Sequence, residues 1–146
     1  MITLALFEKM ADDKVAGLTR NKDFYWEEIP LQKDGSPAQG VWLVTRQGDL
    51  TGSHNGLNLR STVDFYVGFA NKVKTEATHQ AILEWLLNNR CVCQLSGSVG
   101  GTTYSYRNVR IRQTATPENG GATENGTIVK IASALLVYDD NNKRKE

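Results

Sequence analysis

The chain has 146 residues, 17 Lys plus Arg against 16 Asp plus Glu, and a formal net charge of +1. This length suits one domain that buries about two thirds of the surface of its unfolded chain in a single core. The near balance of charge excludes a global field that would attract nucleic acid, a membrane surface or an acidic substrate. Any electrostatic partner must therefore be recognised by local patches.

The start of the chain, MITLALFEKMADDKV, reaches acidic residues after a short apolar run and lacks a basic leader with a small-residue cleavage site. No stretch approaches the roughly eighteen uninterrupted apolar residues of a membrane-spanning helix. We therefore expect no signal peptide, no contact with a membrane, and a soluble protein made in a cytosol. Cys91 and Cys93 are the two cysteines, and without further ligands nearby they predict small half-buried thiols rather than a zinc site.

The first predicted element is an amphipathic helix. Between residues 3 and 18 apolar side chains recur at steps of three and four residues, with charged residues between them. A short strand follows from Phe24 to Ile29 and is stopped by Pro30. The stretch LQKDGSPAQG, residues 31–40, is a loop by composition.

A hairpin is the clearest prediction in the middle of the chain. Its arms are Val41 to Arg46 and Leu57 to Ala70, and its tip, GSHNG, is rich in residues that tolerate positive φ. Along the second arm apolar residues alternate with wetter ones, so one face belongs to the core. The tip is also a candidate for reaching a neighbouring molecule.

A second helix and three strands complete the predicted fold. Thr75 is the expected N-cap of the helix, which ends near Asn88 to Arg90. The strands are Cys91 to Leu95, Tyr104 to Gln113 and Thr127 to Tyr138. The last of these is apolar on both sides, so either it is central with both faces covered or one face awaits a partner.

Together these elements predict an α+β protein, within the broad α/β class, with one mixed, mainly antiparallel sheet of about five to six strands. Two helices pack on this sheet, in the order α-β-β-β-α-β-β-β. Residues 1–138 form the single domain, and the charged stretch 139–146, DDNNKRKE, is expected to be a disordered tail.

No residue set in the sequence indicates a reaction. A nucleophile with a base, a carboxylate pair and a metal cluster are all missing from the pattern, and neither His54 nor His79 has a motif around it. The glycines of GSVGG, residues 97–101, precede a strand and lack the lysine and helix of a phosphate loop, which predicts a turn. We therefore expect no enzyme, cofactor or metal.

The segment TYSYRNVRIR, residues 103–112, is the one local pattern that indicates a partner. As a regular strand it places Tyr104, Tyr106, Arg110 and Arg112 on one face. Three interpretations remain open: a solvated face, a protein interface, or a module that binds single-stranded nucleic acid and also uses Arg107.

The stretch TATPENGGATENG, residues 114–126, is unusually long for a loop without structure of its own. We expect its glycines to keep it mobile in a free subunit, while polar groups such as Glu118 and Glu124 make contacts after docking. A surface loop without a partner is the alternative, because long insertions cost little stability.

The layout of the chain resembles the tail terminator proteins, also called tail completion or minor tail proteins, of long-tailed, lambda-like bacteriophages and prophages. The similarity runs from about residue 2 to residue 139. It lies in the opening helix LALFEKMADDKVAGL, the strand and Pro-Gly loop leading to GVWLVTRQGDL, the alternating STVDFYVGFA, the helix EATHQAILEWLLNN, and a closing hairpin ending ASALLVYD.

The resemblance implies a structural virion protein that forms a homo-hexameric ring, caps the tail tube protein, stops tube polymerisation and offers a surface to the head–tail connector proteins. DNA would pass through its lumen without sequence-specific binding, and the ring would sit at the head-proximal end of the tail after assembly in the host cytoplasm. Another neck protein is the nearest alternative. The expected subunit or tube contacts are Ser53, His54, Asn55, Tyr104, Tyr106, Arg110, Arg112, Pro117, Glu118, Asn119, Glu124 and Asn125.

Overall fold

The computed structural model describes residues 2–28, 31–33, 35, 38–50, 57–114, 119–122 and 128–141. Within these ranges the chain forms two α-helices, one short 3-10 helix and seven strands. In chain order they are α1 (Ile2–Asp12), η1 (Val15–Gly17), β1 (Phe24–Trp26), β2 (Gly40–Leu50), β3 (Leu59–Gly68), α2 (Lys72–Asn88), β4 (Cys91–Val99), β5 (Thr102–Thr114), β6 (Asn119–Ala122) and β7 (Ile128–Asp140).

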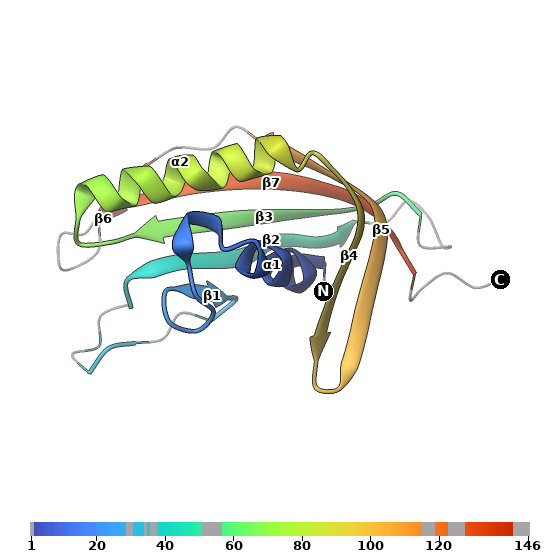
Figure 1. The fold of residues 1–146 in the computed structure, drawn as a ribbon, viewed down its shortest axis with the longest axis horizontal. Helices are drawn as coiled ribbons and strands as arrows, with labels where there is room; N and C mark the ends of the chain where they lie inside the picture. The colour runs from blue at the N-terminus through green and yellow to red at the C-terminus, as the bar shows by residue number, and fades with distance from the viewer. Residues whose placement is uncertain are drawn as a thin grey trace.

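All seven strands belong to one curled sheet of order β1-β2-β3-β7-β5-β4, with β6 paired to β7 off this path. β1 runs parallel to β2, and every other pairing is antiparallel. Both helices pack over the sheet, and the β4–β5 hairpin bends away from the remaining strands (Figure 1). The predicted α+β class and element order are confirmed, with the short β6 as an additional strand. The last long strand, β7, is central in the sheet, between β3 and β5.

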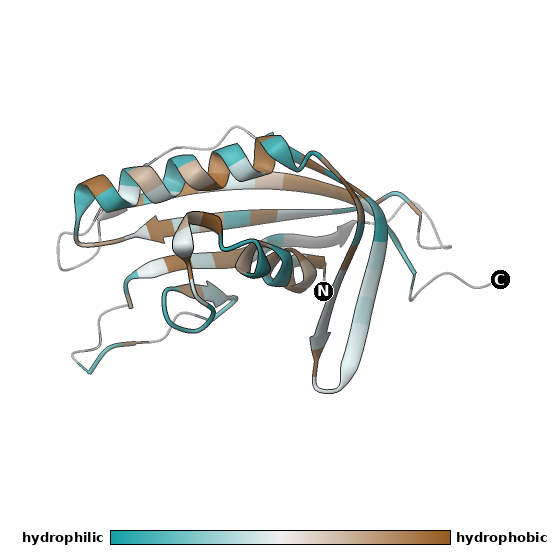
Figure 2. Ribbon diagram, in the orientation of Figure 1, coloured by the Kyte–Doolittle hydropathy of each residue, from teal (hydrophilic) through white to brown (hydrophobic). Residues whose placement is uncertain are grey.

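The main core lies between the two helices and one face of the sheet. Phe65 of β3, Leu136 of β7 and Val109 of β5 are fully or almost fully buried there, beneath Leu6 of α1 and Ile82 of α2. Brown, hydrophobic positions recur along the strands and along the helices (Figure 2). One continuous cluster therefore joins elements from both ends of the chain.

The first helix is shorter than its apolar period predicts. It ends at Asp12, because Lys14 and Ala16 adopt left-handed φ angles of 52° and 53°. Val15 and Leu18 are nevertheless buried in the core. The apolar spacing correctly predicted which side chains are buried. It did not predict that the backbone stops being helical between them.

The start of α2 also differs from the prediction. Asn71 is the N-cap and accepts hydrogen bonds from the N–H groups of Val73 and Lys74 at 2.9 and 3.2 Å. Thr75 lies one turn inside the helix, where its hydroxyl bonds both the N–H and the carbonyl of Phe69. This hydroxyl ties the helix to the end of β3 instead of capping the helix.

Several strand limits differ from those expected. β1 ends at Trp26, because Glu27 has a φ of 65°. β4 runs on to Val99, so the turn is confined to Gly100 and Gly101. The short β6 lies inside the stretch expected to lack structure of its own, and β7 extends two residues into the expected tail.

Both cysteines are exposed, so the prediction of half-buried thiols is wrong. They lie on β4, at one edge of the sheet. In the described part of the chain, neither helix is long and apolar enough to cross a membrane.

Candidate functional site

The face of the sheet turned away from the core cluster, called the outer face from here on, carries most of the distinctive polar side chains. Alternation along each strand separates the two faces. On β5, Val109 and Ile111 are buried in the core, whereas Arg110 and Arg112 are exposed. On β3, Arg60 is likewise exposed between buried Leu59 and Ser61.

A β-bulge at Asn108 overturns the predicted grouping of tyrosines with arginines. Between Arg107 and Arg110 the pairing of β5 with β7 shifts by one residue, and Asn108 takes a left-handed φ of 50°. Tyr106 therefore lies on the core side, only 3% exposed, with its ring edge-on to Tyr138 at 5.3 Å between centroids.

Tyr104 is half-buried and packs against the same core cluster. The prediction that Tyr104, Tyr106, Arg110 and Arg112 share a face is therefore wrong. A bulge adds one residue to a strand, and this reverses the side on which every later side chain lies. The two arginines are available at the surface, and the aromatic rings are not arranged beside them.

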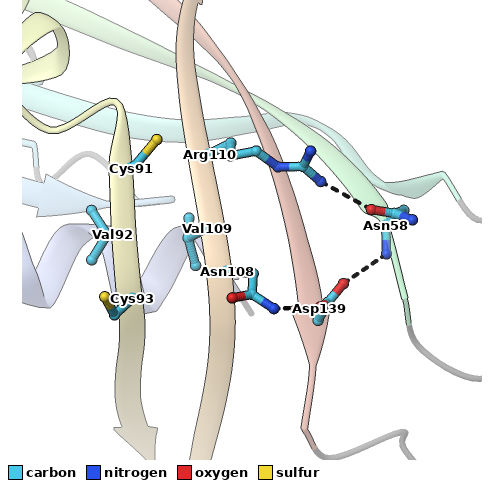
Figure 3. Close-up of a pocket in the computed structure, with 8 residues that line it drawn as sticks. All are labelled: Asn58, Cys91, Val92, Cys93, Asn108, Val109, Arg110 and Asp139. Atoms are coloured by element: carbon cyan, nitrogen blue, oxygen red, sulfur yellow. Dashed lines mark hydrogen bonds between the residues drawn. The ribbon is translucent and has the colours of Figure 1, made fainter.

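A polar cluster surrounds the bulge on the outer face (Figure 3). The Asp139 carboxylate accepts hydrogen bonds from the backbone N–H of Asn58 at 2.9 Å and from the side-chain amide of Asn108 at 3.0 Å. Arg110 in turn donates to the side-chain oxygen of Asn58 at 2.9 Å. These groups line a hollow of about 460 Å³ together with Cys91, Val92 and Cys93 of β4 and Val109 of β5.

The pKa of Asp139 lies below its ordinary value. Burial alone would raise it, but the hydrogen bonds from Asn58 and Asn108 and the charges of Arg107 and Arg110 outweigh that effect. The carboxylate is consequently a negative charge that links the bulge to the start of β3. Both of its oxygens accept hydrogen bonds from groups of the same chain.

We predict that acid weakens the fold partly through Asp139. Because the pKa of this carboxyl is lower in the folded than in the unfolded chain, its stabilisation is present above the ordinary aspartate pKa. That stabilisation is lost as the pH falls from there through the lowered folded value. Asp139→Asn should therefore be less stable at neutral pH and should lose less stability across that acidic window, as measured by urea unfolding at a series of pH values. Parallel pH profiles for the two proteins would contradict this role.

Three arginines and two aliphatic side chains occupy adjacent rows of the outer face. Val137 of β7 pairs with Arg60 on one side and Arg110 on the other, and Leu135 pairs with Arg112. Both aliphatic side chains are half-buried. These residues line a shallow hollow of about 230 Å³ next to the polar cluster, and we call the five residues the arginine face.

The free edge of β4 is the second distinctive surface. β4 ends the strand order, and within the described residues nothing pairs with its outer side. Its nine residues, CVCQLSGSV, contain no charged side chain and no proline. Natural sheets usually protect a long edge with lysines, prolines or bulges, so an edge of this composition is suited to pairing with another strand.

The remaining predicted contacts fall mainly outside the described residues. This applies to Ser53, His54 and Asn55 of the hairpin tip, and to Pro117, Glu118, Glu124 and Asn125. Asn119 lies in β6, opposite Lys130 of β7. Neither Asn58 nor Arg60 was predicted as a site residue. Arg60 could have been found, because it continues the series of polar positions that alternate with the buried residues of β3.

The described residues contain no group of three or more histidine, cysteine, aspartate or glutamate side chains that could hold a metal ion. His79 has a structural contact, since its Nε2 lies 3.0 Å from the carbonyl oxygen of Ile131. The described geometry defines an α+β protein with an arginine-bearing outer face and a long free strand edge.

A comparison with models of known protein families and a search of the curated proteins found no match for this chain.

Proposed function

We propose that the protein is a structural virion subunit, a tail terminator that closes the end of a phage tail tube as a ring of six copies. The α+β fold and the element order agree with the resemblance described above. On this proposal the partners are other copies of the chain, the tail tube protein and the head–tail connector proteins. DNA passes through the ring without sequence-specific contacts.

The observation that carries this proposal is the edge of β4, which pairs with no other strand among the described residues. A ring requires a head-to-tail contact, in which one surface of a subunit meets a different surface of the next. A strand edge supplies such a contact through main-chain hydrogen bonds, which need no particular side chains. β4 is long enough for this role, and Val99 at its far end is 42% exposed.

The nucleic-acid interpretation is weakened by the bulge. Base stacking needs exposed aromatic rings beside the phosphate-binding cations. Tyr106 is buried, and Tyr104 packs toward the core side. A neighbouring neck protein is the nearer alternative.

A single lysine on the edge of β4 tests the proposal. Ser96 is exposed on this strand, and Ser96→Lys places a charge where a second strand would approach. We expect the unaltered protein to form six-subunit rings, alone or on tube ends, and Ser96→Lys to remain folded but at least about tenfold weaker in association, a loss of about 1.4 kcal/mol. Light scattering and negative-stain imaging measure both.

Gln80→Lys is the matched control, because Gln80 is exposed on α2 and the same charge is added away from the sheet edge. Rings should persist in this variant. If Ser96→Lys still formed rings, the edge of β4 would not be part of the interface between subunits. A failure of the unaltered protein to form rings either alone or with tube protein would overturn the proposed function.

A further inference from the structure

We propose that the arginine face is a docking site for an acidic segment of a partner protein that carries apolar side chains beside its carboxylates. The site consists of Arg60, Arg110 and Arg112 around Leu135 and Val137. This inference does not depend on ring formation, because the face is separate from the outer edge of β4 and lies within one subunit.

The strand register sets the spacing of the site. Arg60 and Arg110 flank Val137 in one row, so two strand spacings of roughly 4.8 Å separate their backbones. Arg112 lies two residues along β5 from Arg110 and therefore on the same face. An extended segment laid across this surface presents carboxylates at a comparable spacing.

Among the described residues, two of the three arginines of this face have no ion-pair partner, and Arg110 has Asp139 as a nearby opposite charge. Arg60 and Arg112 make no ion pair or hydrogen bond with other described residues, whereas Arg46 on the neighbouring β2 lies 3.7 Å from the Asp64 carboxylate. Arg110 is oriented by Asn58, and it retains further N–H donors for a ligand. Arginine forks bind carboxylates through paired hydrogen bonds, so an acidic ligand is the complementary one.

The floor of the site indicates which acidic ligand fits. Leu135 and Val137 are half-buried aliphatic side chains between the arginines. A protein segment can cover them with its own apolar side chains, in the combination of arginine and apolar contacts typical of protein interfaces. A nucleic-acid strand would leave this floor uncovered and would find no aromatic ring there, since Tyr106 is buried.

Peptide binding tests the inference directly. The probe is a short labelled peptide of alternating Glu and Leu, compared with peptides of Gln and Leu and of Glu and Ser, and with oligo-dT. We expect the Glu–Leu peptide to bind best, with an affinity that falls about tenfold or more in the triple variant Arg60→Gln, Arg110→Gln, Arg112→Gln. Fluorescence anisotropy at low and physiological salt gives these affinities.

The control is the triple variant Lys22→Gln, Lys33→Gln, Lys72→Gln, which removes the same charge from exposed positions on other parts of the molecule. It should bind the Glu–Leu peptide as the unaltered protein does. An equal loss of affinity for the Glu–Leu peptide in both triple variants would show an effect of net charge and would contradict the proposed site. So would equal binding of the Glu–Leu and Glu–Ser peptides, tighter binding of oligo-dT, or no binding of the Glu–Leu peptide at any concentration reached.

Discussion

Gly40→Ala is expected to lower the free energy of unfolding by about 3 kcal/mol or more. Gly40 begins β2 with a φ of +148°, and a Cβ there would lie 2.4 Å from the backbone carbonyl oxygen of Asp23. The same carbonyl accepts the N–H of Val41 at 2.8 Å. The methyl group therefore meets a fixed part of the β1–β2 junction, and backbone strain of about 1–3 kcal/mol adds to a steric cost of similar size.

Gly35→Ala separates these two contributions. Gly35 also has a positive φ, +83°, but a Cβ at this position meets nothing within 4 Å. This variant should lose only about 1 kcal/mol, the usual cost of forcing alanine into a glycine conformation. Chemical denaturation of both variants gives the comparison. A Gly40→Ala protein as stable as Gly35→Ala would mean that β1 and β2 do not meet as described.

Phe65→Ala is expected to destabilise the fold by about 3–5 kcal/mol, the usual cost of removing a fully buried aromatic ring. Phe65 is 0% exposed and lies on β3, opposite Leu43 of β2 and Ala132 of β7. Small neighbours such as Ala132 cannot fill the space by changing rotamer, so most of the cavity should remain. Thermal and urea unfolding measure the loss.

Tyr66→Ala is the control for Phe65→Ala. Tyr66 follows Phe65 on the same strand, but it points to the outer face and is half-buried. The loss should be clearly smaller, about 1–2 kcal/mol, because less of the ring is removed from water. Equal losses would contradict the assignment of the core to the helix side of the sheet.

The sequence predicted the fold class because apolar spacing reports burial, and burial determines which elements must pack together. The alternation in β3 correctly assigned Val63, Phe65 and Val67 to one buried face. Spacing was less informative about backbone conformation, as the break after α1 shows. The expected N-cap, Thr75, was wrong, because the side chain of Asn71 caps the helix and the hydroxyl of Thr75 bonds Phe69 instead.

The composition of the arginine face could not be predicted from one segment. A regular strand places Tyr106 on the same face as Arg110. Tyr106 and Val109 are both apolar but three residues apart, so a regular strand would put them on opposite faces, and this was a signal of the bulge. Arg60 joins the site from β3 through pairings on both sides of β7. Such a register is set by long-range packing, which local sequence does not encode.

The mass of the purified protein across a concentration series, with imaging of any large species alone and with tube protein, tests the proposed function most directly. We predict rings of six subunits with a central hole, which dissociate to folded subunits in Ser96→Lys and persist in Gln80→Lys. A protein that stays monomeric at high concentration and also fails to assemble on tube ends would contradict the proposal that it is a tail terminator.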